Sequence, residues 1–278
     1  MAVRLVRYTT SERDWELATA APAPALRGHF GEYTGYREIT GGPLARREVP
    51  HSAITLVINL GEPLVVDGRA YGSFVAGLHE RPASTEHPGQ QYGIQLDLPP
   101  LTAYGLLGHP LGELGNAVVG LDDLLGRPAR RLVQALGEAP GWPARFALLD
   151  RALAERLDRG PRVAPEVGWA WRQLCRTGGR IGVAELAAGT GWSHRHLATR
   201  FRQQVGLSPK AFGRVLRFQR AVRLLHAPAR PTFAAIAAAC GYFDQAHLNR
   251  DFRELAGATP TALRAEVNFF QDEVPSAA

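Results

Sequence analysis

Two short stretches of the sequence carry arginine, threonine and histidine side chains at the spacing of one helix face. Turning about 100° per residue from the apolar positions places Arg195, Thr199 and Arg202 outward in the first stretch, and Arg250 and Arg253 outward in the second. The outward sets are completed by Gln203, Ala246 and Glu254, with His247 beside them. Guanidinium, amide and hydroxyl groups hydrogen-bond base edges, and arginine also pairs with phosphates. These faces predict recognition of a nucleic acid rather than a covalent reaction.

The two stretches are near copies: "GWSHRHLATRFRQQVGLSP" at 191–209 and "GYFDQAHLNRDFRELAGATP" at 241–260. Leu197 and Phe201 recur 51 positions later as Leu248 and Phe252, whereas the glycines at 191 and 241 are 50 apart, so the second turn holds one extra residue. The apolar inner faces match, but the outer faces differ except at Arg202 and Arg253. Matching inner faces and different outer faces are expected if the two copies share one structural unit but recognise different bases.

Each copy has an alanine-rich helix, a glycine turn and a second helix, which is the outline of a helix-turn-helix. Gly191 and Gly241 are predicted to take the left-handed conformation, and Ser193 and Asp244 to cap the second helices. The segment 209–227 between the copies predicts a helix about 28 Å long. Successive major-groove faces are about 34 Å apart, so this helix could hold two reading heads over neighbouring grooves.

The charge of the chain is divided unevenly. The net charge is +6, but residues from 161 onward hold 16 Lys and Arg against 8 Asp and Glu, whereas residues 1–160 hold 16 against 18. An excess of +8 in the C-terminal part indicates a polyanionic partner, and with the repeat it predicts double-stranded DNA.

The first half is predicted to contain strands at 54–60, 63–68, 73–78 and 91–98, a pattern that favours a small barrel or sandwich. A helical pattern follows, beginning with "LGELGNAVVGLDDLLG" and ending with a helix whose apolar stripe could pack on the barrel or on a second subunit. That stripe consists of Phe146, Leu149, Leu153 and Leu157. The proline-containing segment 158–166 predicts a domain boundary, and everything after it is predicted to be helical.

No catalytic residues, metal site or cofactor are predicted. The histidines of "HRH" at 194–196 would point about 200° apart on a helix. His51 and His79 lie in or beside strands, where a satisfied structural histidine is favoured over a metal ligand. Cys175 and Cys240 are interpreted as small buried residues, and no serine lies in a Gly-x-Ser-x-Gly motif.

Residues 166–266 resemble the AraC/XylS family of bacterial transcription regulators, through the two stretches above, "RFQRAVRLL" and "IAAACGYFDQAHLNRDFRELAGATPTALR". The resemblance implies seven helices carrying two helix-turn-helix motifs, at about 181–204 and 232–256. It implies base-facing positions at His194, Arg195, Ala198 and Thr199 in the first head, and at Gln245, Ala246, His247 and Arg250 in the second. Arg202 and Arg253 complete the expected DNA-binding set.

The phrases "LVINLGEPL", "FVAGLHERP" and "LLGHPLGEL" are similar to the cupin-type sensing domains of some members of this family. The expected fold is therefore α+β in two domains. Residues 1–160 would form a cupin-like barrel with trailing helices, which binds an effector or dimerises. Residues 161–278 would form an all-α DNA-binding domain with two helix-turn-helix motifs joined by a long helix.

The leading hypothesis is a sequence-specific transcription regulator that is not an enzyme. Its partners would be double-stranded DNA, a small-molecule effector, RNA polymerase and a second copy of the chain. One alternative is a cupin-like enzyme joined to a DNA-binding module, and another is an N-terminal half that only dimerises. No apolar run approaches the roughly 18 residues of a membrane span and no apolar segment of a secretory signal follows the first arginines, so a cytoplasmic location is expected.

Overall fold

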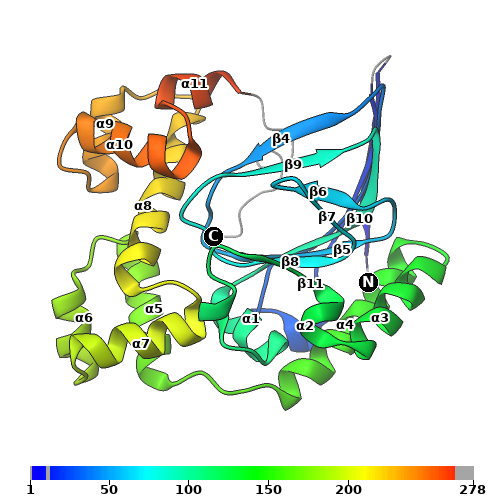
Figure 1. The fold of residues 1–278 in the computed structure, drawn as a ribbon, viewed down its shortest axis with the longest axis horizontal. Helices are drawn as coiled ribbons and strands as arrows, with labels where there is room; N and C mark the ends of the chain where they lie inside the picture. Colours follow the sequence, from blue (N-terminus) through cyan, green and yellow to red (C-terminus); the bar gives the residue numbers. More distant parts are fainter. Residues whose placement is uncertain (1, 11–12, 267–278) are drawn as a thin grey trace.

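The protein is described by a computed structural model that covers residues 2–10 and 13–266 (Figure 1). The N-terminal half contains two antiparallel sheets. The larger sheet contains β1 (Arg4–Thr9), β2 (Arg13–Ala20), β3 (Tyr33–Thr40), β5 (Ile54–Asn59), β8 (Phe74–Ala76), β10 (Gln90–Leu98) and β11 (Val118–Gly120). The smaller sheet contains β4 (Leu44–Glu48), β6 (Leu64–Val66), β7 (Arg69–Tyr71) and β9 (Ala83–His87).

The strand pairing corrects the expectation of a barrel. The larger sheet runs β1-β2-β3-β10-β5-β8-β11 and the smaller one β4-β9-β6-β7, and within the described residues no ladder joins the two into a closed ring. All four predicted strands are present, but the four strands before residue 54 and also β7, β9 and β11 were not predicted. Short alternating strands indicate a half-buried sheet without showing whether its edges meet, so a sandwich and a barrel look alike in sequence.

Helices cover the outer face of the larger sheet, on the side away from the smaller one (Figure 1). They are η1 (Pro24–Leu26), α1 (Pro100–Leu107), η2 (Leu111–Glu113), α2 (Leu121–Leu125), α3 (Arg127–Glu138) and α4 (Trp142–Arg159). The helical prediction for "LGELGNAVVGLDDLLG" was wrong in its middle. Asn116 takes a φ of 60°, and Val118 then pairs with Ala76 of β8, so sheet formation overrides the helical spacing there.

The apolar stripe of α4 packs within the chain. Phe146 and Leu149 are fully buried and Leu153 nearly so, and the Phe146 ring stacks on Tyr33 of β3 with centroids 5.3 Å apart. Leu157 packs against the same core. The sequence left open that the chain self-associates through this stripe. That alternative is wrong, because the apolar side chains of the stripe are already buried beneath the larger sheet of the same chain.

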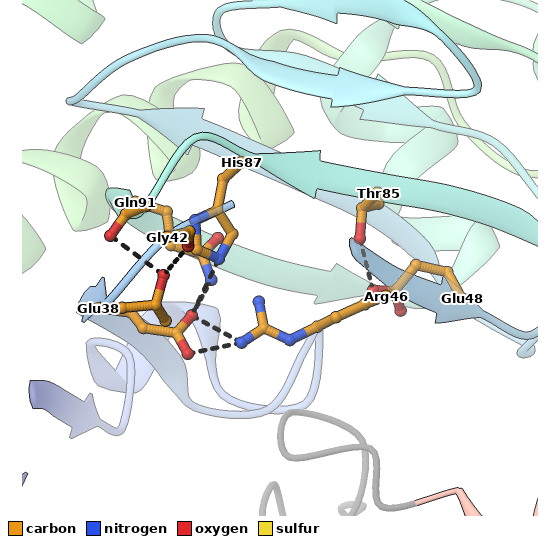
Figure 2. A network of polar contacts seen from close by, with 9 residues as sticks. Glu38, Gly42, Arg46, Glu48, Thr85, His87 and Gln91 are labelled. Carbon is orange, nitrogen blue, oxygen red and sulfur yellow. Dashed lines mark hydrogen bonds and ion pairs between the residues drawn. The ribbon is translucent and has the colours of Figure 1, made fainter. Parts of the chain in front are cut away.

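A buried polar network ties the two sheets together (Figure 2). Glu38 of β3 accepts two hydrogen bonds from Arg46 of β4, at 2.6 and 2.7 Å, and one from Gln91 of β10 at 2.6 Å. The His87 Nε2 atom of β9 lies 3.5 Å from the same carboxylate. Burial by itself would raise the pKa of Glu38, but the contact with His87, the hydrogen bonds from Arg46 and Gln91 and the charge of Arg46 lower it to about 2.

The C-terminal half is helical throughout its described residues. It comprises α5 (Pro165–Thr177), α6 (Val183–Thr190), α7 (His194–Val205), α8 (Pro209–Leu225), α9 (Phe233–Cys240), α10 (Gln245–Ala256) and α11 (Pro260–Ala265). Cys240 is buried as predicted, but Cys175 is exposed. No helix in the described part of the chain is long and apolar enough to cross a membrane.

The predicted boundary falls in a break between helices, since α4 ends at Arg159 and α5 begins at Pro165. The packing nevertheless crosses this break. One hydrophobic core joins Leu107 and Leu111 of the first half to Phe201 and Val205 of α7. The division at residue 160 therefore stays a prediction about folding units, because the two halves share a core.

We expect Phe146→Ala to destabilise the protein by about 3–5 kcal/mol, because it removes a fully buried ring and leaves a cavity. Urea unfolding would measure the loss. Arg151→Ala, at an exposed position of the same helix, is the matched control and should change stability little. A Phe146→Ala protein of unchanged stability but altered oligomeric state would contradict the packing described here.

We expect Glu38→Gln to flatten the acid dependence of stability. The folded pKa of Glu38 is lowered from its ordinary value of 4.5 to about 2, so its ionised form stabilises the fold above pH 4.5 and this contribution is lost as the pH falls toward 2. Urea unfolding at a series of pH values should show a steeper loss over that interval in the wild type than in the variant. Parallel pH profiles would contradict the assignment.

Candidate nucleic-acid interface

Two helix-turn-helix units lie at the two ends of α8 (Figure 1). The first head is α6 and α7, and the second head is α9 and α10. Gly191 and Gly241 end the first helix of each head with φ of 71° and 77°, the left-handed conformation predicted for both. The predicted caps are confirmed, since Ser193 accepts a hydrogen bond from His196 N and Asp244 accepts one from His247 N.

A second repeated contact holds each turn against its recognition helix. In the first head the Trp192 and His196 rings meet edge to face with centroids 4.5 Å apart, and in the second head Tyr242 and His247 do so at 5.2 Å. His247 is half-buried by this contact. Its position thus matches that of His196, which was not among the residues expected to contact DNA, and not that of His194.

Most of the predicted DNA-binding side chains are on the surface. His194, Arg195 and Thr199 of α7 are exposed, as are Gln245, Ala246, Arg250 and Arg253 of α10, whereas Ala198 is half-buried. The buried face beneath them is the predicted one: Leu197 and Phe201 in α7, and Leu248, Phe252 and Leu255 in α10, are fully buried. The helical periodicity therefore located both faces of both recognition helices.

Arg202 has a different setting from Arg253. Its main chain lies against η2 of the N-terminal half, so close that a Cβ added at Gly112 would stand 3.1 Å from the Arg202 carbonyl oxygen and 3.2 Å from its Cγ. Arg202 remains exposed beyond this contact. The last turn of α7 thus anchors the first head, and the two arginines that match in sequence do not share the same surroundings.

The second recognition helix is fixed to α8 by charge. Arg214 of α8 donates to Asp251 at 2.9 Å and is also paired with Glu254. Asp251 is buried, and the hydrogen bonds and charges of these two carboxylates raise the pKa of Arg214 although its partial burial opposes this. Glu254, predicted to face outward, is therefore bound to the spacer helix.

A segment of the N-terminal half also holds the second head. Residues 47–52, which we call the strap, join the end of β4 to β5. Arg47 donates to the Ala256 carbonyl at the end of α10 at 2.7 Å, and Ser52 donates to Gln219 of α8, also at 2.7 Å. Val49 packs into the core of the second head. A guanidinium at the C-terminal end of a helix is favourably placed in the field of the helix dipole.

The strap also borders a cavity of about 300 Å³ between the two sheets. Its apolar lining includes Val57, Val66, Phe74 and Ala76, and its polar lining includes Glu48, His51, Thr55, Thr85 and Asp97. Helix α8 contributes Gln219, Val222 and Arg223, so the C-terminal half forms part of the cavity wall.

The polar groups in the cavity are hydrogen-bonded to one another. Glu48 accepts from Thr85 at 3.1 Å, and the Thr55 hydroxyl lies 3.2 Å from His51 Nε2 and donates to Asp97 at 3.1 Å. The Nδ1 atom of His79 lies 2.6 Å from the Gly77 carbonyl oxygen. Burial raises the pKa of Glu48 and lowers that of His79, which favours the uncharged form of both groups.

Neither the strap nor the cavity was found from the sequence. The strap contacts join residues 167 and 209 positions apart, and such pairings leave no local pattern in a single sequence. The cavity residues come from β4, β5, β6, β8, β9 and β10 among others, and of these β4 and β9 were not predicted. The alternation of side chains in β5 could have indicated which of its residues face inward, but not that they face an empty space.

A family described as a helix-turn-helix domain matches residues 186–266. No curated protein matches the chain. Among solved structures, a probable AraC family transcriptional regulator from Rhodopseudomonas palustris CGA009 is 32% identical over 36% of this chain and 95% of its own, with a TM-score of 0.33.

Two other structures are similar to parts of the chain. The DNA-binding domain of AdpA, a global transcriptional factor solved with a target DNA, is 31% identical over 37% of this chain and 89% of its own, with a TM-score of 0.32. ToxT from Vibrio cholerae O395 covers 81% of this chain and 98% of its own at 8% identity, with a TM-score of 0.45. The helix-turn-helix match and the sequence identity to the regulator of R. palustris place the chain in the AraC family of DNA-binding transcription regulators.

Proposed function

We propose that the two heads read successive major grooves of one DNA duplex and that the N-terminal half controls them in response to a small molecule. The observation that carries the proposal is the pair of recognition helices with matching buried faces and different exposed faces. They are joined by α8, whose 17 residues span about 25 Å. That length is compatible with two heads on neighbouring grooves.

We assign base reading to side chains near the N-terminal ends of α7 and α10, where helix-turn-helix proteins contact base edges. These are His194, Arg195 and Thr199 in the first head, and Gln245, His247 and Arg250 in the second. Arg202 and Arg253 are assigned to phosphates, because they lie one or two turns further along and are the same residue in both heads.

The cavity between the sheets is the proposed effector site. Its volume is at the small end of the range for ligand pockets, and it is bordered by both the strap and α8, so a bound molecule would touch the support of the second head. A larger hollow of about 670 Å³ lies between β1, β2, β3, β10 and the start of α4, but its lining includes no residue of the DNA-binding half.

The lining of the cavity defines the class of effector. Apolar side chains form one part of the wall, and Glu48 and His79 are shifted toward their uncharged forms in another. Charged side chains also line the cavity: Arg46, which is paired with Glu38, together with Arg81, Arg223 and Asp97. The lining therefore favours a small, partly apolar molecule with one or two hydrogen-bonding groups.

The remaining partners are proposed on functional grounds. Binding of two copies to one operator would raise affinity by effective concentration, so we keep the homodimer as a proposal, formed through a surface other than the buried stripe of α4. A regulator that activates would contact RNA polymerase, and a protein that works on operators acts in the cytoplasm.

The alternative function, a cupin-like enzyme joined to a DNA-binding module, would be favoured by stoichiometric metal in the purified protein. Among residues 2–10 and 13–266, no group of three or more His, Cys, Asp or Glu side chains is arranged to hold a metal ion.

Arg250 and Arg253 test the division between base reading and phosphate binding. We expect Arg250→Ala to relax the preference at one base pair by about 1–3 kcal/mol, because a guanidinium can bind O6 and N7 of a guanine. We expect Arg253→Ala to weaken binding to all DNA sequences about equally. It should also lower by roughly one the slope of the logarithm of the binding constant against the logarithm of the salt concentration. Selection from randomised operators followed by salt titration measures both effects.

The two arginines serve as controls for each other, since both are exposed on α10 and neither change should affect folding. An unchanged sequence preference for Arg250→Ala would show that its assignment is wrong. Absence of salt-dependent DNA binding by the wild-type chain would contradict the proposed function as a whole.

The cavity can be tested with a pair of matched substitutions on strands. Screening small, partly apolar molecules for a shift in melting temperature should find a ligand of the wild type, and Ala76→Leu, which fills part of the cavity, should abolish the shift. Ala45→Leu, at an exposed position of β4, should leave it intact. A ligand that stabilises all three proteins equally would bind elsewhere and would exclude the cavity as its site.

A further inference from the structure

The extra residue in the second head can be identified from the structure. Tyr242 makes the ring contact that Trp192 makes in the first head, and Asp244 is the cap that corresponds to Ser193. Tyr242 and Trp192 are 50 positions apart, whereas Asp244 and Ser193 are 51 apart. The residue without a counterpart is therefore Phe243, inserted between the aromatic residue of the turn and the cap of the recognition helix.

Phe243 is 93% exposed, far more than any other large apolar residue in the described part of the chain. The others that are exposed (Leu5, Val6, Tyr8 and Ile39) lie in β1 and β3 and range from 37% to 50%. The turn that carries Phe243 is held on both sides, because Tyr242 packs on His247 and Asp244 caps α10. The ring is thus presented to solvent by a well-fixed piece of backbone.

The position of this ring indicates its partner. It directly precedes α10, the helix whose N-terminal residues face the bases in a helix-turn-helix complex. The adjacent Gln245 and Ala246 are also exposed. In the major groove, only thymine presents a methyl group, and apolar side chains such as phenylalanine recognise it by contact.

We propose that Phe243 provides the second head with an apolar base contact, to the 5-methyl group of a thymine in its half-site, that the first head lacks. This inference rests on the proposed DNA-reading function and adds a specificity determinant to it. The contact excludes water from both the ring and the methyl group, so its contribution depends on that one methyl group and not on a hydrogen bond or a charge.

The test uses the full chain and an operator selected in vitro, in which each thymine of the second half-site is replaced in turn by deoxyuridine. Deoxyuridine keeps base pairing and removes only the 5-methyl group. We expect one replacement to weaken wild-type binding about fourfold, as loss of a buried methyl group should. Phe243→Ala should weaken binding to the thymine operator by at least as much and should be insensitive to that replacement.

Three controls accompany the test. Phe243→Leu keeps an apolar side chain and should retain most of the sensitivity to deoxyuridine. Leu5→Ala removes an exposed apolar residue of the N-terminal half and should change no binding constant. Thermal melting should be the same for wild type and Phe243→Ala, because a ring this exposed contributes little to the core.

Three outcomes would overturn the inference. The first is that Phe243→Ala binds the thymine operator as tightly as the wild type does. The second is that no deoxyuridine replacement weakens binding of the wild type. The third is that the same replacement costs Phe243→Ala as much affinity as it costs the wild type. Unchanged DNA binding with reduced transcription would assign the ring to a protein partner instead. If the wild type binds no DNA sequence selectively, the proposed function fails, and this contact fails with it.

Discussion

The anchoring of the first recognition helix to the N-terminal half is the contact on which the arrangement of the two halves depends. The last turn of α7 and η2 meet backbone to backbone: a Cβ on Gly112 would stand 3.1 Å from the Arg202 carbonyl oxygen, and one on Gly115 would stand 2.8 Å from that of Gly206. Leu111 and Val205 belong to the same buried core. Because close-packed interiors tolerate little sliding, this shared core fixes the first head against the N-terminal half.

The second head is attached in a different way. Val49 packs into its core, a Cβ added at Gly257 would stand 3.3 Å from Pro82 Cγ, and polar contacts run through the strap, from Arg47 to the Ala256 carbonyl and from Ser52 to Gln219 of α8. Polar contacts of this kind can be exchanged for water at a small net cost, unlike the apolar core under α7. Since the strap and α8 also border the cavity, an effector there would act on the support of the second head and not on that of the first.

The sequence was most informative where structure is local. The inserted residue, the glycine turns, the caps and both faces of each recognition helix follow from spacings of a few residues, and these predictions were confirmed. It was least informative where the outcome depends on distant partners. The spacing of Phe146 and Leu149 shows that one face of α4 is buried, but nothing in that spacing distinguishes a sheet of the same chain from a second subunit. For the same reason the two sheets could not be distinguished from a barrel.

The tertiary contacts give the two recognition helices different surroundings. A helical wheel assigns equivalent outward positions to α7 and α10, but in α7 the main chain of the last turn also contacts η2, while the Arg202 side chain stays exposed. In α10 the carboxylates of Asp251 and Glu254 are drawn to Arg214 of the spacer. Asp251 is buried, whereas Glu254 is exposed, so the ion pair with Arg214 offsets the negative charge of Glu254 beside Arg250 and Arg253, which suits the approach of a phosphate backbone. The same repeat thus yields one head whose recognition helix is held to η2 and another whose recognition helix is held to its spacer helix.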